Sequence, residues 1–326
     1  MSEGRLEGAD DVVLPFSVSA LDVRGRVARL GPAIDALLAR HDYPDAVSRV
    51  LGEAAALTAL LGASLKFEGR FQLQTKSDGP IEMLVVDFDA PDRLRAYARF
   101  DAARLAESSA NPRTAELLGR GILAMTIDQG SEASRYQGVV ALEEQGLEEA
   151  AHQYFRQSEQ IPTRVRLAVA EEFAEGRRAW RAGGLLLQFL PSSPERARQA
   201  DLPPGDAPDE HVASGPGEDD AWVEARALAD TVEDHELVDP AVSSERLLYR
   251  LFHERGVTVF DAQPVHEECR CSRDRILAMM RNFSADDRRD MIGDNGRIGV
   301  TCEFCSRVYD LDPQEVEAEL APGDAG

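Results

Sequence analysis

The chain has 326 residues, and its apolar content of 43% is enough to build a buried core in one large or two smaller domains. Its formal net charge of −23 repels nucleic-acid phosphate and anionic lipid, which argues against nonspecific binding to either. Because the first residues lack the basic and apolar regions of a secretory signal, and no segment has the apolar run that a membrane span needs, we expect a soluble cytoplasmic protein.

Two helices are predicted near the beginning of the chain, at residues 27–40 and 45–66. Apolar residues at helical spacing mark the first helix, and His41-Asp42-Tyr43-Pro44 interrupts the pattern. The second helix begins at Pro44-Asp45 and is apolar on nearly every side. A helix of that kind is usually buried at the centre of a core. Before residue 27 we predict only an acidic lead.

Strands dominate the prediction between residues 71 and 190. The apolar period falls to two from Phe71 onward, and Ser77-Asp78-Gly79-Pro80 is typical of a turn. A helix is expected at residues 147–160. Strand runs mixed with helices, without strict alternation, predict an α+β domain of mainly antiparallel sheet with packed helices over residues 1–190. Its predicted strands begin at residue 71 and continue at residues 83–88, 95–100, 121–127, 137–142, 164–170 and 184–190.

The composition changes after residue 190 to proline, glycine, alanine and acidic residues. Such a stretch cannot bury enough apolar surface to offset the entropy lost on ordering. We therefore predict a flexible linker with an acidic helical segment over residues 191–242, the helical spacing lying at residues 221–236. A more amphipathic helix is expected at residues 243–255, at the start of a small C-terminal zinc-binding domain of residues 243–326.

Four cysteines form two tight pairs near the end of the chain, and the sequence has no others. The first pair is Cys269 and Cys271, and the second is Cys302 and Cys305. Two turns that each present two sulfurs supply the four thiolates of one tetrahedral Zn²⁺ site. The spacing therefore predicts a single metal site with these four ligands.

Charged residues surround the first cysteine pair. We expect Arg270, Arg273 and Arg275 to offset the negative charge that four thiolates place on Zn²⁺, and to lower the thiol pKa before metal binds. His266 lies three residues before Cys269 and is an alternative ligand. It is the less favoured one, because four thiolates already fill the coordination shell.

The cysteine cluster is either a structural staple or a redox switch, and the spacing leaves both open. The terminal module is too small for a large core, so metal binding worth roughly 10–16 kcal/mol would supply most of its stability. If an oxidant bridged the sulfurs within each pair, the resulting loops would be tiny and would constrain the unfolded chain little. Oxidation would then remove the metal without replacing its stabilisation, so we expect it to unfold the module together with the adjacent acidic segment.

Two other functional classes use similar cysteines. A zinc-ribbon regulator that binds nucleic acid is disfavoured by the acidic balance and by the absence of an aromatic and basic motif. A thiol-disulfide oxidoreductase would use Cys302-Glu303-Phe304-Cys305, but that motif is not set in the βαβ pattern expected for such chemistry. A single metal site that uses both cysteine pairs explains more of the sequence than an oxidoreductase that uses one pair.

Motifs spread over nearly the whole chain carry a resemblance to one known family. They include His41-Asp42-Tyr43-Pro44, Leu65-Lys66-Phe67-Glu68-Gly69, Arg135-Tyr136-Gln137-Gly138, Cys269-Arg270-Cys271-Ser272-Arg273 and Cys302-Glu303-Phe304-Cys305. On these residues the sequence resembles the 33 kDa chaperonins, which are redox-regulated heat-shock holdases of bacteria. The stretch from residue 191 to residue 220 departs from that family, because it is longer and richer in proline and acid than the usual linker.

The resemblance implies a redox-regulated chaperone rather than an enzyme. Reduced protein would hold one zinc through the four cysteines and be inactive. Oxidation would form the disulfides Cys302–Cys305 and then Cys269–Cys271, release zinc and unfold the C-terminal domain with its linker. The oxidised form would bind unfolding client proteins without ATP, protect them from oxidative and heat-induced aggregation, and tend to form a homodimer. Neither nucleic acid nor membrane is an expected partner.

An apolar sheet face under the later helices is the expected client surface. We predict that residues 221–236 and 243–255 cover the sheet of residues 71–190 in the reduced protein, and that this face becomes accessible when they melt. Within that sheet, Gly183-Gly184 is typical of a bend or bulge in a strand, and close approach by another chain is the alternative.

Overall fold

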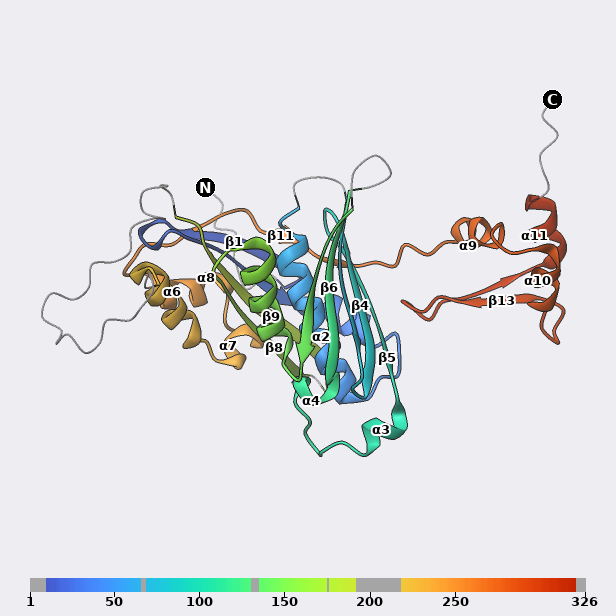
Figure 1. The fold of residues 1–326 in the computed structure, drawn as a ribbon, viewed down its shortest axis with the longest axis horizontal. Helices are drawn as coiled ribbons and strands as arrows, with labels where there is room; N and C mark the ends of the chain where they lie inside the picture. The colour runs from blue at the N-terminus through green and yellow to red at the C-terminus, as the bar shows by residue number, and fades with distance from the viewer. Residues whose placement is uncertain (1–9, 66–68, 130–134, 175, 192–217, 321–326) are drawn as a thin grey trace, which may run out of the picture. The chain divides into compact units, whose positions relative to one another are not determined.

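The computed structural model describes residues 10–65, 69–129, 135–174, 176–191 and 218–320. The chain divides into two compact units, Met1–Glu267 and Glu268–Gly326. The predicted α+β class is confirmed, since both sheets and helices build the first unit (Figure 1). No helix in the described part of the chain is long and apolar enough to cross a membrane.

Two six-stranded sheets form the frame of the first unit. We name them sheet A and sheet B. Almost all of their strand pairs are antiparallel, and the exception is β12, which runs parallel to β5. Sheet A has the order β10-β1-β2-β9-β8, with β11 also on β1, and is built from β1 (Val12–Val18), β2 (Val23–Leu30), β8 (Thr163–Ala174), β9 (Arg177–Phe189), β10 (Thr258–Val259) and β11 (Gln263–Pro264). Sheet B has the order β12-β5-β4-β3-β6-β7, with β3 (Arg70–Ser77), β4 (Ile81–Asp89), β5 (Arg93–Phe100), β6 (Arg120–Asp128), β7 (Tyr136–Glu143) and β12 (His266–Glu267).

Helix α2 (Asp45–Gly62) lies between the two sheets and is buried along most of its length, as its all-round apolar pattern predicts (Figure 1). It ends at Gly62, where an added Cβ would lie 2.5 Å from the Phe88 ring of β4. Small residues therefore let this helix approach the sheets closely. The remaining short helical segments of the frame are η1 (Ser19–Leu21), α1 (Pro32–Leu38), α3 (Ala102–Ala106), α4 (Thr114–Leu118), α5 (Leu147–Tyr154) and the π-helical turn η2 (Phe155–Glu159).

The other face of sheet A is covered by α6 (Asp220–Asp230), α7 (Asp234–Val238) and α8 (Ser244–Phe252), which we call the helical cover (Figure 1). Together with sheet A these helices form a second apolar core, separate from the one around α2. The layers of the first unit are thus the helical cover, sheet A, α2 and sheet B. The cover buries Trp222, Leu247, Leu248, Leu251 and Phe252 against Leu14, Phe16, Val18, Leu185, Leu187 and Phe189 of sheet A.

The predicted helix at residues 27–40 is wrong in its first part. Residues 27–30 belong to strand β2, the helix α1 begins only at Pro32, and strand β1 was not predicted at all. Sheet A is buried on both faces, so Val23 and Val27 point to the helical cover while Ala28 and Leu30 point to the core around α2. A strand that is apolar on both sides loses the period of two, and its pattern then resembles that of a buried helix.

The helical cover lies on part of the predicted surface. It packs on β8 and β9, which fall within residues 71–190, and on β1 and β2, which the prediction did not include. Strands β3–β7 of the same range belong to sheet B and lie outside the core that the cover forms. Residues 243–267 belong to the first compact unit, although the sequence placed 243–326 in one domain. The predicted division into a core domain of residues 1–190, a linker with a helical segment of residues 191–242 and a zinc-binding domain of residues 243–326 stays a prediction. Of the predicted linker, residues 192–217 lie outside the described residues.

The second unit is a two-stranded sheet with three short helices. Its elements are α9 (Arg273–Met280), α10 (Ala285–Asp290), β13 (Ile298–Thr301), β14 (Val308–Leu311) and α11 (Pro313–Leu320). Among the residues described up to position 320, the buried members of its hydrophobic core are Ile276, Leu277, Met280, Ile298, Leu311 and Val316. A core of this size supplies little stability by itself.

Glu53 is an acidic residue of the mainly apolar helix α2. Both of its carboxylate oxygens lie within hydrogen-bond distance of the Thr114 hydroxyl, at 3.0 and 2.9 Å. Burial raises the pKa of Glu53 to about 7, the Thr114 hydrogen bond lowers it by less, and the charge of Glu148 adds to the rise. Between pH 4.5 and about 7 the folded protein therefore keeps a proton on Glu53. The unfolded chain, in which the pKa has its ordinary value of 4.5, has already released that proton.

This raised pKa predicts a pH-dependent loss of stability. The contribution of Glu53 is fully present below pH 4.5 and is lost as the pH rises through about 7. Replacing it by glutamine, which mimics the protonated acid, should raise the free energy of unfolding at pH 8 by about 1–3 kcal/mol and leave it nearly unchanged at pH 4.5. Urea unfolding followed by the fluorescence of Trp180 and Trp222 measures this. The control is Glu143→Gln on strand β7, and equal pH profiles for Glu53→Gln and the wild type would contradict the assignment.

Candidate functional site

Cys269 and Cys271 lie in the short stretch between β12 and α9. The stretch ends at Ser272, the N-cap of α9, whose Oγ accepts a hydrogen bond from the backbone N–H of Arg275 at 3.3 Å. The backbone of Ser272 is extended, with φ −147° and ψ 161°. Arg275 also donates from Nη1 to the carbonyl of Arg270 at 2.6 Å, which ties the residue between the two cysteines to the helix start. These local bonds hold the first pair in place.

Cys302 and Cys305 lie in the turn that joins β13 to β14. The backbone N–H of Cys302 donates to the carbonyl of Arg307, and that of Ser306 donates to the carbonyl of Cys302, both at 2.9 Å. Ser306 has a φ of 55°, in the left-handed region that closes a tight turn. A hairpin turn closed by these two backbone hydrogen bonds therefore presents the second pair of sulfurs.

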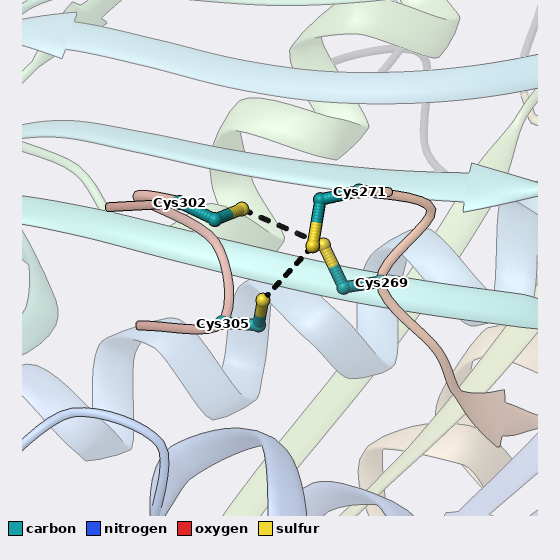
Figure 2. Close-up of side chains that lie close together, drawn as sticks. All are labelled: Cys269, Cys271, Cys302 and Cys305. Carbon is teal, nitrogen blue, oxygen red and sulfur yellow. Dashed lines mark hydrogen bonds between the residues drawn. The ribbon is translucent and has the colours of Figure 1, made fainter. Parts of the chain in front are cut away.

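The two pairs converge, so that all four sulfur atoms lie within 4.8 Å of one another (Figure 2). Cys269 and Cys302 are 3.7 Å apart at Sγ, and Cys271 and Cys305 are 3.3 Å apart. All four are free thiols; Cys305 is buried and the others are half-buried. A tetrahedron with metal–sulfur bonds of about 2.3 Å has sulfur–sulfur edges of about 3.8 Å, so these positions fit one tetrahedral metal ion.

The thiols of the cluster differ in acidity. Burial raises the pKa of Cys271, but hydrogen bonds from Tyr309 and the neighbouring thiols outweigh it and lower the pKa to about 7. Burial raises the pKa of Cys305 to about 12 and also raises that of Cys269. The thiols of Cys269 and Cys305 therefore keep their protons at neutral pH unless a cation balances the charge of their thiolates. A metal that binds here has to displace those protons, so its affinity rises with pH.

Tyr309 is the polar neighbour that the sequence prediction missed. Its hydroxyl donates to Cys271 Sγ at 3.1 Å. Hydrogen bonding to Tyr309, followed by the charges of Cys271 and Cys305, raises the pKa of Arg307 and keeps that guanidinium charged beside the cluster. Both residues follow the second cysteine pair in the β13–β14 hairpin. The sequence shows the alternation of side chains along β14. Only the fold shows that this strand returns toward Cys271.

Two of the arginines predicted to neutralise the cluster make other contacts, and their effect on the thiols stays a prediction. Arg273 pairs with Glu315 and Glu319 of α11, at 3.0 and 2.8 Å. Arg275 bonds the Arg270 carbonyl. His266, the alternative ligand, belongs to strand β12 of the first unit, where its backbone N–H donates to the carbonyl of Asp92 at 2.7 Å. Its ring is not one of the four grouped ligands.

Comparison with known proteins agrees with this arrangement. A family model described as Hsp33 protein matches residues 11–312. The chain belongs to the Hsp33 family. A 33 kDa chaperonin of Caulobacter vibrioides is 47% identical over 307 residues, which cover 93% of this chain and 95% of the relative. One from Pseudomonas aeruginosa is 37% identical over 309 residues, covering 94% and 93%.

A solved member of the Hsp33 family shows the same fold. The crystal structure of the 33 kDa chaperonin (heat shock protein 33 homologue) from Thermotoga maritima matches with a TM-score of 0.74 at 19% identity. The match covers 95% of this chain and 98% of the other. Membership of the Hsp33 family supports a chaperone function for this chain, and the four cysteines form a potential metal site within that fold.

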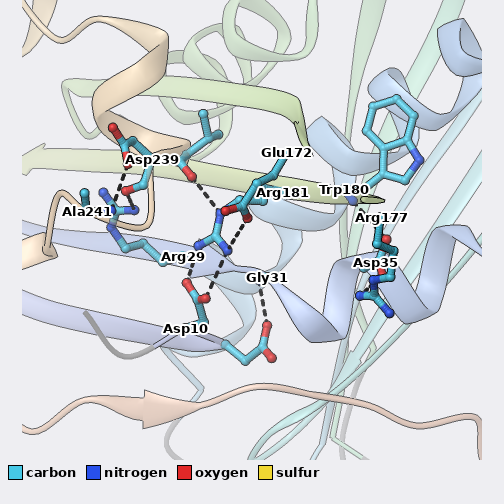
Figure 3. Close-up of polar contacts among 12 residues, drawn as sticks. Asp10, Arg29, Gly31, Asp35, Glu172, Arg177, Trp180, Arg181, Asp239 and Ala241 are labelled. Carbon is cyan, nitrogen blue, oxygen red and sulfur yellow. Dashed lines mark hydrogen bonds and ion pairs between the residues drawn. The ribbon is translucent and has the colours of Figure 1, made fainter. Parts of the chain in front are cut away.

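The helical cover is held to sheet A by two arginines as well as by apolar packing (Figure 3). Arg29 of β2 is only 2% exposed, and its guanidinium donates to the carbonyls of Asp239 and Glu236 at 2.9 and 2.6 Å. Arg181 of β9 donates from Nε to the carbonyl of Val238 at 2.7 Å. These carbonyls lie at the C-terminal end of α7, where helix carbonyls lack partners within the helix. The two side chains therefore bind the end of α7 as a cation binds a helix C-terminus.

A glycine lets α7 approach the sheet closely enough for these bonds. A Cβ at Gly183 would lie 2.2 Å from the carbonyl oxygen of Leu237 in α7. Strand β9 pairs with β2 and β8 in continuous register through Gly183 and Gly184, so the predicted bend or bulge is wrong. The close approach comes from another segment of the same chain. Gly183, Arg29 and Arg181 thus form one polar attachment point for the helical cover, which we call the α7 anchor.

The α7 anchor predicts that one methyl group can loosen the helical cover. Gly183→Ala should push α7 away from β9, because the contact is with backbone and cannot be relieved by a side-chain rotation. We expect the reduced variant to bind several times more 8-anilinonaphthalene-1-sulfonate than the wild type and to be cleaved faster within residues 218–252. Gly299→Ala is the matched control, since a Cβ there meets no atom within 4 Å. If Gly183→Ala bound no more dye than the wild type, the close contact at Gly183 would not be what holds the helical cover.

Proposed function

We propose that this protein is a redox-regulated, ATP-independent holdase chaperone whose reduced, zinc-bound form is inactive. The observation that carries the proposal is the convergence of four free thiols in a unit that has a hydrophobic core of only six buried residues. Such a unit depends on what its sulfurs bind. Membership of the Hsp33 family supports the chaperone part of the proposal.

In the reduced form Cys269, Cys271, Cys302 and Cys305 would hold one Zn²⁺. When bound, the ion supplies cohesion rather than catalysis, because four protein ligands leave no open position for substrate. Binding of this kind contributes roughly 10–16 kcal/mol to folding of a small module. That is enough to stabilise α9, the β13–β14 hairpin and α11 around their small core. Tyr309 donates a hydrogen bond to Cys271 and stabilises the thiolate form.

Oxidation would convert the ligands into the disulfides Cys269–Cys271 and Cys302–Cys305. Each disulfide forms as two thiolates lose two electrons, and hydrogen peroxide that accepts them, together with two protons, becomes two molecules of water. Disulfide sulfurs no longer hold the ion, and each new loop is too short to constrain the unfolded chain appreciably. The second unit then unfolds, and we propose that residues 191–255 unfold with it.

Loss of the helical cover would create the client-binding surface. Sheet A would expose Phe16, Leu187 and Phe189 together with the remaining apolar side chains that now face α6–α8. A continuous apolar surface of this kind binds the exposed apolar segments of other unfolding proteins. It would also favour a homodimer of the oxidised form. The protein would act in the cytoplasm on unfolding client proteins, without catalysing a reaction and without nucleic-acid or membrane partners.

The two rival functions have no supporting observation in the structure. The motif of Cys302 and Cys305 lies in the turn between two antiparallel strands, and not at the start of a helix after a strand, where a thioredoxin-like thiol is activated. The net charge of −23 stays unfavourable for a nucleic-acid regulator.

The proposal predicts chaperone activity only after oxidation. Light scattering of a thermally unfolding client should be suppressed by the peroxide-treated full-length protein and not by the reduced, zinc-loaded protein. Zinc release, followed with a colorimetric chelator, should reach one ion per chain during the same treatment. The control is oxidised protein that is reduced again with zinc present, which should lose its activity. Equal suppression by the oxidised and reduced forms would refute the switch.

Tyr309 provides a test of the metal site itself. Tyr309→Phe removes the hydrogen bond to Cys271 and should weaken zinc binding by the reduced protein by roughly tenfold, because partners that orient and stabilise metal ligands have effects of that size. Competition with a chromogenic chelator at pH 7.5 measures the affinity. Tyr249→Phe is the matched control, since that tyrosine lies in α8 and is 65% exposed. An unchanged affinity in Tyr309→Phe would show that the hydroxyl does not act on the ligand.

A further inference from the structure

A cavity of about 220 Å³ lies inside the first unit, between sheet A and sheet B at the C-terminal end of α2. Its walls come from both sheets, from the end of α2 and from the π-helical turn η2. None of the elements that carry the cysteines or form the helical cover contributes to it. Its apolar lining includes Leu61, Leu65, Phe71, Met125, Phe155 and Leu186.

One cation, Arg26 of β2, lines this apolar cavity. Arg26 alternates with Ala28 and Leu30 on the strand, so it points to the inner side of sheet A rather than to the helical cover. Its Nε is buried and has no hydrogen-bond partner among the described residues. Burial lowers its pKa, and no described carboxylate counteracts this. A buried guanidinium nitrogen without a partner is costly, and it favours an anion as its acceptor.

The acidic residue that lines the cavity is already occupied by other partners. Glu159 Oε1 accepts hydrogen bonds from the hydroxyls of Tyr154 and Tyr136, each at 3.2 Å. No ion pair joins Glu159 to Arg26 in the described part of the chain. Among the described residues, the cavity therefore combines an apolar wall with the positive charge of Arg26, for which no ion pair is found in that part of the chain.

The wall next to Glu159 has an unusual backbone. Residues Phe155–Glu159 form a π-helical turn that continues α5, and the turn ends at Gln160 with a φ of 55°. Single π-helical turns are rare and occur often at functional sites, because they shift side chains relative to a regular helix. Here the turn places Phe155 and Glu159 in the lining of the cavity.

We propose that this cavity binds a small amphipathic monocarboxylate, such as a short fatty acid, with its carboxylate on Arg26 and its alkyl tail against the apolar wall. The volume corresponds to roughly seven water molecules at about 30 Å³ each, which suits an acid of about six carbons. Guanidinium and carboxylate match in geometry and charge, so the headgroup forms the strong type of hydrogen bond. The binding site is independent of the thiol cluster and of the proposed redox switch.

Isothermal titration of the reduced full-length protein with hexanoate tests the proposal, with 1-hexanol as the ligand that has the same tail and no charge. The wild type should bind hexanoate saturably at one site per chain, and hexanol at least tenfold more weakly. Arg26→Met should lose at least tenfold in hexanoate affinity, and without ligand it should melt at a higher temperature, because it removes a buried charge that has no partner. Arg26→Lys, which keeps the charge, should still prefer the acid to the alcohol.

Arg24→Met is the matched control, since Arg24 lies on the same strand and is exposed. It should bind hexanoate as the wild type does. Equal binding of hexanoate to the wild type and to Arg26→Met, or equal binding of acid and alcohol to the wild type, would overturn the proposal. A lower melting temperature for Arg26→Met would also overturn it, because it would show that the guanidinium already has a stabilising partner within the chain.

Discussion

Sheet A is apolar on both faces, and this constraint organises the first unit. One face packs on α2, a long helix buried between two sheets. The other face packs on three short helices, α6–α8, which come later in the chain than α2. Removing the second layer would leave Phe16, Leu187 and their neighbours facing water, at a cost of about 25 cal/mol for each Å² of apolar surface. The fold therefore contains a large apolar surface that the helical cover keeps from water.

The helical cover is attached to sheet A by both apolar and polar contacts. Its apolar side chains pack against the sheet, while Arg29 and Arg181 bind backbone carbonyls at the end of α7. Those carbonyls are accessible to the arginines only because Gly183 lets the helix lie directly on strand β9. The polar bonds need the helical geometry of α7, so they are lost together when that short helix unfolds. The polar part of the attachment is therefore made or lost as a whole.

The two compact units differ in the source of their stability. The first has extensive cores on both faces of sheet A, and the second has six buried apolar residues and a group of four sulfurs. A change at the sulfurs therefore acts on the weaker unit, where a loss of several kcal/mol exceeds what the small core supplies. This difference is the physical basis for the proposed response to oxidants. The Arg26 cavity, in contrast, lies in the stable unit and does not depend on the state of the thiols.

The sequence by itself determined the features that follow from local pattern or composition. The four cysteines, the α+β class, the buried helix α2 and most strands after residue 70 are visible there, because ligand chemistry and side-chain periodicity are local properties. Tertiary structure decided which surfaces meet. Strands β1 and β2 were missed because burial on both faces erases the alternation, and Gly183, Tyr309 and Arg26 acquire their roles from segments distant in the chain. A side chain's partner across a fold depends on the path of the whole chain, which no local pattern records.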